Sequence, residues 1–197
     1  WISTISTPTT DRYALESIQL ILEFLPRACE DGSDLEAREA MAIASYKAGR
    51  AFTQALVGYV HALSHQVGAH YGTPHGLGNA VILPKVLAFS KGPAQSRLAR
   101  LAVETGLGEQ GDDEAALAQA FIDNIVELNK RLGLPDCIAE VSEEDIPAMA
   151  KGATREALLN YAVPAHMGRR DCEELLRSLQ DEPAVEENLE VELKQAA

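Results

Sequence analysis

Hydrophobic residues recur at intervals of three and four along most of the chain, which is the period of an amphipathic α-helix. In the first such segment, Ala14, Ile18 and Leu25 share one face behind a possible N-cap cluster at residues 9–11. Pro26 is expected to end this helix. No segment alternates apolar and polar residues as a half-buried strand does. We therefore predict an all-α, helical bundle-like domain.

The same pattern predicts further helices, separated by short loops that contain glycine, proline or aspartate. Pro84 is expected to kink or split the nearly all-apolar segment that contains it. A second apolar run after Gly49 either continues the preceding helix or starts a new one. The predicted ranges are 35–49, 51–67, 76–90, 93–104, 112–132 and 170–179, with a short helix opened by a possible capping box at 142–145.

Composition narrows the class of protein. The 197 residues suffice for one domain, and 46% of them are hydrophobic, so a buried core is expected. A formal net charge of -13 argues against nucleic acid or an anionic membrane as partner. No apolar run reaches the length of a membrane span, and the three cysteines form no Cys-x-x-Cys pair. These features favour a cytoplasmic protein with free thiols.

Acidic residues dominate the end of the chain. We expect a helical metal-binding domain over residues 1–180 and a solvated acidic tail over 181–197.

The chain opens at Trp1 without a methionine, and we expect it to be a fragment or a processed piece of a longer protein.

Histidine is the residue type that points to chemistry, because four of the five histidines lie between positions 61 and 75. His61 and His65 are four residues apart and share a helix face, as the two ligands of a His-Glu-x-x-His zinc site do. Ala62 stands where that motif has its glutamate, which argues against a metalloprotease. His75 follows a short loop that can fold back towards His61. Spacing alone therefore predicts two or three imidazoles around one divalent metal, with ordinary core packing as the alternative.

Carboxylate ligands are missing from this part of the chain. No aspartate or glutamate lies between Arg50 and Glu104, so any carboxylate at the site must come from elsewhere. His70 is expected in mid-loop, where lining a substrate site and simple exposure are equally plausible. His166 is expected to be an ordinary loop residue.

Three features of the sequence carry a resemblance to a known family. The run Thr7–Asp11 before an Ala/Ile-rich helix, the spacing of His61 and His65, and the run Thr73–Pro84 resemble the C-terminal helical domain of the iron-dependent (group III) alcohol dehydrogenases. The resemblance extends over about residues 2–179 and is most specific at 61–84.

This resemblance implies an enzyme that interconverts an alcohol and an aldehyde or ketone. In the family, an Asp-x-x-x-His helix supplies two metal ligands, and the two later histidines correspond to His61 and His75. In the family, the metal lies in the cleft between this helical domain and a nicotinamide-binding domain. The resemblance implies that His65 lines this cleft as a catalytic, proton-relaying residue rather than as a ligand. The implied cofactors are Fe2+ or Zn2+ and NAD(P), with a small-molecule alcohol or aldehyde as substrate.

The chain lacks two expected parts of such an enzyme. Neither an Asp-x-x-x-His ligand motif nor a glycine-rich phosphate loop of the nicotinamide-binding domain is present. We therefore expect this chain alone to be inactive, and its unpartnered apolar surface makes a homo-oligomer plausible. The competing hypothesis is a non-catalytic helical dimerisation or scaffold domain in which the histidines hold no metal.

Overall fold

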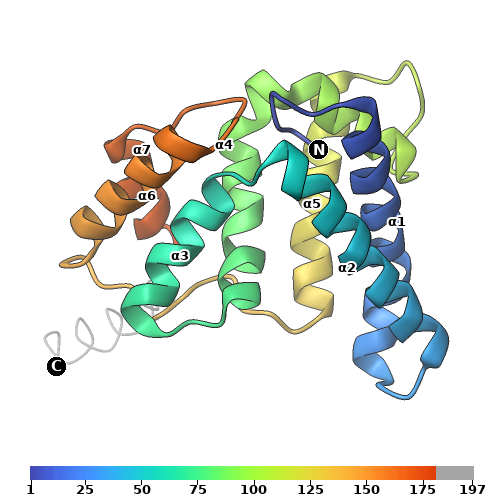
Figure 1. Cartoon of the computed structure of the whole chain (residues 1–197), viewed down its shortest axis with the longest axis horizontal. Coiled ribbons are helices and arrows are strands. Elements are labelled where there is room, and N and C mark those ends of the chain that lie inside the picture. Colours follow the sequence, from blue (N-terminus) through green and yellow to red (C-terminus); the bar gives the residue numbers. More distant parts are fainter. Residues whose placement is uncertain (181–197) are drawn as a thin grey trace, which may run out of the picture.

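A computed structural model describes residues 1–180 and confirms the all-α prediction, because those residues contain helices and no strand (Figure 1). The predicted acidic tail at 181–197 lies outside the described residues. The helices are α1 (Pro8–Glu30), α2 (Leu35–Ala55), α3 (Tyr59–Tyr71), α4 (His75–Glu104), α5 (Glu114–Arg131), α6 (Ile146–Asn160) and α7 (Arg169–Arg177).

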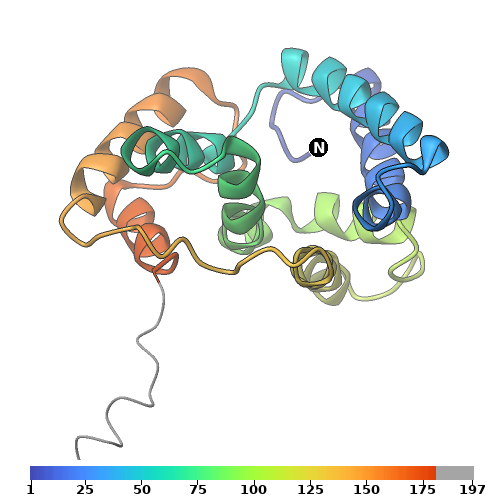
Figure 2. The same ribbon diagram turned by 90° about the horizontal axis from the view of Figure 1, so that it is seen from below.

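The helices form two packed groups that share the long helix α4. The hairpin α1–α2 and helix α5 lie on one side of α4, and α3, α6 and α7 lie on the other (Figures 1 and 2). One apolar core includes Leu63, Ile82, Met149 and Leu176, and joins α3, α6 and α7 to the first half of α4. The second core joins the later half of α4 to α5 around Leu98. The two halves of α4 thus belong to different cores, which fixes the groups against one another.

Prolines interrupt fewer helices than the sequence predicted. Pro26 lies inside α1, which continues to Glu30, and both Pro84 and Pro93 lie inside α4. The predicted segments 76–90 and 93–104 are therefore one helix of 30 residues. Proline removes one backbone hydrogen bond, but packing along both cores outweighs that local cost.

The break between the second and third helices lies later than Gly49. Helix α2 runs through Gly49 and ends at Ala55, and α3 starts at Tyr59. Leu56 has φ 62°, in the left-handed region that non-glycine residues rarely adopt. This strained turn re-aims the chain so that the histidine-bearing helix α3 packs on α4 and α6.

The side-chain caps differ from the sequence prediction at two helices. Asp34 and Asp113 cap α2 and α5 through their side chains. Helix α1 is capped by Thr7 rather than by residues 9–11. The predicted capping box at 142–145 is wrong: α6 begins only at Ile146, and Ser142 instead donates a hydrogen bond to the side chain of Asp145.

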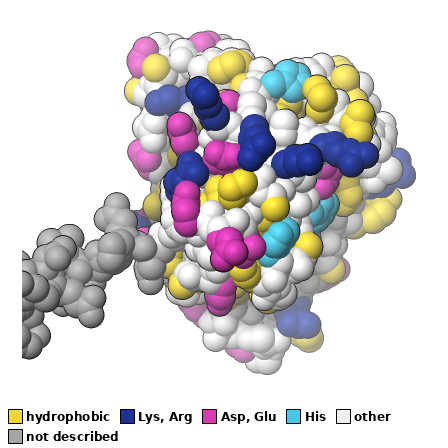
Figure 3. All heavy atoms as spheres, turned by 90° about the vertical axis from the view of Figure 1, so that its left-hand side faces the viewer, with side chains coloured by type: hydrophobic (Ala, Val, Ile, Leu, Met, Phe, Trp, Pro, Cys, Tyr) yellow, Lys and Arg dark blue, Asp and Glu magenta, His cyan; other side chains and the backbone are white. Residues whose placement is uncertain are grey.

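Acidic and basic side chains are mixed on the surface that carries α3, α6 and α7. Figure 3 shows basic and acidic side chains interspersed on this face. Arg169 pairs with Glu173 at 2.9 Å, and Arg177 pairs with Glu143 at 2.8 Å. Across residues 1–180, no helix is long and apolar enough to cross a bilayer.

Arg97 of α4 holds both α1, through an ion pair, and the N-terminal segment, through Trp1. Arg97 donates hydrogen bonds to both carboxylate oxygens of Asp11, at 2.6 and 3.1 Å, and its guanidinium lies 4.8 Å from the centre of the Trp1 ring. Replacing Asp11 with asparagine is expected to lower the free energy of unfolding by about 1 kcal/mol at pH 7, because the guanidinium loses its charged partner. Urea unfolding measures this, with Asp136→Asn at an exposed position as control.

The contribution of this ion pair should also depend on pH. Burial alone would raise the pKa of Asp11, but the hydrogen bonds and charge of Arg97 outweigh it, so the pKa is lowered. Because the pKa is lower in the folded state, the ion pair contributes its full stabilisation above the ordinary aspartate pKa of about 3.9. This stabilisation is lost as the pH falls through the lowered pKa of the folded state. The difference between wild type and Asp11→Asn should therefore shrink below about pH 4. An unchanged difference at pH 2 would contradict this assignment.

Candidate functional site

Three histidine rings meet where α3 faces the start of α4. The ring centres of His61 and His75 are 5.1 Å apart, and His65 lies 5.9 Å from His61 and 5.3 Å from His75. The rings of His65 and His75 are stacked, with 18° between their planes. The sequence spacing thus predicted a real cluster: α3 supplies two rings from one face, and the 72–74 loop returns the third to them.

Small residues allow the two helices to approach this closely. Gly78, in the first turns of α4, faces Ser64 on α3, and a Cβ at position 78 would lie 2.6 Å from the Ser64 Oγ. Both residues are buried. Because Ser64 precedes His65 and Gly78 follows His75 by three residues, this contact sets the separation of the histidines.

His61 is half-buried and its environment favours the neutral imidazole. Burial is the main cause of its lowered pKa, and the nearby rings of His75 and His65 lower it further. Glu156 acts weakly in the opposite direction. A neutral imidazole keeps the lone pair that binds a metal ion.

Asn79 adjoins the histidines from the next turn of α4. Its side-chain nitrogen lies 3.0 Å from the Nε2 of His75 and donates a hydrogen bond to it when that nitrogen is unprotonated. The side-chain oxygen of Asn79 is buried and has no hydrogen-bond partner within the described chain. A hydrogen-bond donor placed beside this oxygen would pair with it while the amide nitrogen keeps its contact with His75.

The donor set fits part of a metal site. Two adjacent imidazoles suit Fe2+ or Zn2+. The buried side-chain oxygen of Asn79 beside them has no hydrogen-bond partner among the described residues, so a polar ligand there would satisfy it. No group of three or more His, Cys, Asp or Glu side chains within residues 1–180 has the geometry to hold an ion. Any metal here therefore needs further ligands from outside these residues.

A carboxylate does reach the cluster from a distant helix. Glu156 of α6 lies 2.8 Å from the Nδ1 of His65 through its Oε1 atom. The sequence indicated that a carboxylate must come from outside 50–104, but nothing in the local pattern singled out Glu156, Asn79 or Tyr161. The residues of this pair are 91 positions apart, so only the packing of α3 on α6 reveals it.

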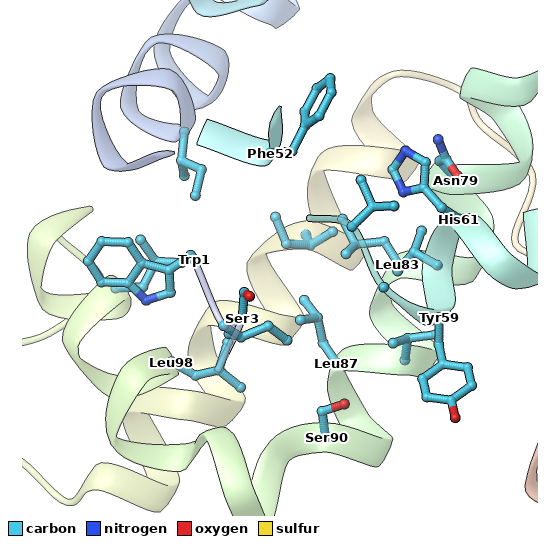
Figure 4. Close-up of a pocket in the computed structure, with 18 of the residues that line it drawn as sticks. Trp1, Ser3, Phe52, Tyr59, His61, Asn79, Leu83, Leu87, Ser90 and Leu98 are labelled. Carbon is cyan, nitrogen blue, oxygen red and sulfur yellow. The ribbon is translucent and has the colours of Figure 1, made fainter. Parts of the chain in front are cut away.

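An apolar pocket opens beside His61. Its volume is about 560 Å³, and it lies between the two helical groups. Figure 4 shows His61 and Asn79 together at one end and Trp1 at the other, with Phe52 and Leu83 between them. Polar groups therefore converge at one end of a space that otherwise suits a small carbon skeleton.

The remaining two histidines do not join the cluster. His70 lies in the last turn of α3 rather than in a loop, is exposed, and its Nδ1 lies 2.9 Å from the carbonyl oxygen of Gln66 on the same helix. The prediction that His70 is in mid-loop is therefore wrong. His166 is exposed in the loop between α6 and α7, as the sequence predicted.

Comparison with known proteins identifies the family. Residues 1–180 match the family model described as "Fe-containing alcohol dehydrogenase family, C-terminal". The chain is 44% identical over 150 residues to an NAD-dependent methanol dehydrogenase of Bacillus methanolicus, which covers 75% of this chain and 39% of that protein. It is 36% identical over 179 residues to a 1,3-propanediol dehydrogenase of Citrobacter freundii, covering 90% and 46%.

Solved structures agree with this result. The crystal structure of a 1,3-propanediol oxidoreductase superposes with a TM-score of 0.85 at 35% identity, covering 90% of this chain and 47% of that one. An alcohol dehydrogenase from Oenococcus oeni gives 0.84 at 30% identity, with the same coverage. The chain spans less than half the length of the relatives it matches. It belongs to the Fe-containing alcohol dehydrogenase family and corresponds to its C-terminal helical domain.

Proposed function

We propose that the full-length protein containing this chain interconverts a small alcohol and its aldehyde or ketone, with a divalent metal and a nicotinamide cofactor. The observation that carries this proposal is the His61–His75 pair: the ring centres lie 5.1 Å apart, and His61 lines one end of an apolar pocket. Relatives named as methanol and 1,3-propanediol dehydrogenases support the same reaction class.

His61 and His75 would hold the metal, as part of a helical metal-binding domain over residues 1–180. Fe2+ is the metal that the family name favours, and Zn2+ suits the same imidazoles. When bound, such an ion supplies Lewis acidity, which favours loss of the alcohol proton. The other ligands come from the part of the protein that precedes or faces this domain.

The remaining side chains of the site have distinct tasks in this proposal. His65 accepts the alcohol proton and passes it to solvent, because its side chain is 44% exposed and its ring stacks on that of His75. Phe52 and Leu83 enclose the carbon chain of the substrate and keep water from it. Asn79 orients the His75 ring through its hydrogen bond to Nε2 as long as no other group occupies the Nε2 lone pair.

The nicotinamide is assigned to a separate domain. A bound nicotinamide supplies the hydride acceptor or donor, and its binding determines the choice between NAD and NADP. Relatives about twice as long as this chain have room for such a domain. A cytoplasmic location and self-association of the domain remain predictions.

Chelation and reloading of the full-length protein test the proposal. We expect alcohol-dependent reduction of NAD or NADP to disappear after treatment with a chelator and to return with Fe2+ or Zn2+, because two imidazoles alone cannot polarise the alcohol. The isolated chain should show no nicotinamide-linked turnover. Full activity in thoroughly metal-free protein would contradict the metal assignment. A full-length protein that binds neither metal nor alcohol would favour the scaffold hypothesis instead.

A further inference from the structure

Glu156 joins His65 to Tyr161 in a network beside the metal ligands. The Oε1 atom of Glu156 lies 2.8 Å from His65 Nδ1 and 2.5 Å from the hydroxyl of Tyr161. The Glu156 side chain is 24% exposed, against 44% for His65. A half-enclosed carboxylate that accepts two hydrogen bonds at one oxygen is held in a single orientation.

Helix packing explains why Glu156 reaches the cluster. On α6, Gly152 lies so close to α3 that an added Cβ would come within 2.2 Å of the side-chain oxygen of Gln66. Glu156 follows Gly152 by one helical turn and therefore lies on the same face. It thus meets His65, the neighbour of Gln66, at the contact between α3 and α6.

Tyr161 keeps the carboxylate in place from the end of α6. Burial, together with the adjacent Glu156 carboxylate, raises the pKa of the Tyr161 phenol, so its hydroxyl stays protonated and donates to Glu156. The same Oε1 atom accepts the Tyr161 hydrogen bond, so we assign it as the acceptor for His65 as well, with the hydrogen on His65 Nδ1.

We propose that Glu156 is a positioning residue for His65: by accepting the Nδ1 hydrogen, it fixes the tautomer in which Nε2 is free to take the proton of the alcohol. The step is a proton transfer. The O–H bond of the alcohol breaks, an Nε2–H bond forms, and the oxygen keeps the electron pair. In the other tautomer, Nε2 carries a hydrogen and His65 cannot act as the base. This inference rests on the proposed function of His65.

The tautomer can be measured without any reaction. In full-length protein labelled with 15N-histidine, nitrogen NMR distinguishes protonated Nδ1 from protonated Nε2, and a His65→Gln variant assigns the signal. We expect Nδ1 of His65 to carry the hydrogen in the wild type. We expect Glu156→Met, which has a similar shape but no oxygen acceptor, to shift His65 towards a mixture of tautomers. Glu156→Gln keeps an acceptor oxygen and should retain the wild-type tautomer.

Kinetics separate this positioning role from a structural one. Glu156→Met should lower kcat by about tenfold with KM and metal content unchanged, and Glu156→Gln should recover most of the loss. A wild-type His65 with its hydrogen on Nε2, or an unchanged kcat in Glu156→Met, would overturn the proposal. If His65→Gln is fully active, the proton-relay role in the proposed function fails, whereas the NMR result still decides whether Glu156 sets the tautomer.

Discussion

Replacing either His61 or His75 with alanine in the full-length protein is expected to remove most of the bound metal and to lower kcat roughly 100-fold or more. Alanine has no lone pair to offer, and the described residues provide no third group that completes a site in its place. The two rings lie 5.1 Å apart and are proposed to hold the same ion, so the loss of either should have a similar effect. Metal analysis of the purified variants and steady-state kinetics with an alcohol measure these effects.

Two other histidines provide matched controls for these variants. His70 is exposed on the same helix with its Nδ1 near a backbone carbonyl, and His166 is exposed in a loop. Alanine at either position should leave metal content and kcat near those of the wild type. His65→Ala should retain the metal but lose most of the rate, because the ring is proposed as a base and not as a ligand. Unchanged metal occupancy in both His61→Ala and His75→Ala would refute the ligand assignment.

The part of the site that was predictable from sequence is the part encoded by helical periodicity. A spacing of four placed His61 and His65 on one face, and a three-residue loop after α3 returned His75 to them. The choice of His61 and His75 as the ligand pair came from the family resemblance, and it stays a prediction. Local pattern and resemblance therefore located the cluster, and the structure supplied its distances.

The rest of the site depends on contacts between helices distant in sequence. Glu156 meets His65 across 91 positions, and no motif connects them. The pocket beside His61 needs the N-terminal segment and both helical groups, so no single segment predicts it. Pro84 lies within a continuous helix because the two cores stabilise α4 along its whole length, an effect that propensity rules omit.

The contact between Gly78 and Ser64 gives the second large expected effect. Gly78→Ala should lower the free energy of unfolding by about 1–3 kcal/mol, because the new Cβ would lie 2.6 Å from a buried hydroxyl. The same strain pushes α4 away from α3 and widens the gap between His61 and His75. Metal affinity of the full-length protein should therefore fall together with stability. Urea unfolding and metal titration measure the two effects.

A second substitution at the same contact distinguishes this cause from a general loss of helix stability. Alanine is a better helix former than glycine, so Gly78→Ala would stabilise α4 if no atom of α3 lay in the way of the new Cβ. Ser64→Ala removes the Oγ atom and leaves the Ser64 Cβ at 3.5 Å from the new methyl group, an ordinary contact. The double variant Ser64→Ala/Gly78→Ala should thus recover most of the stability and metal affinity lost in Gly78→Ala, and the two substitutions should be strongly non-additive. Additive effects would mean that the separation of α3 and α4, and with it the placement of His61 and His75, does not depend on this contact.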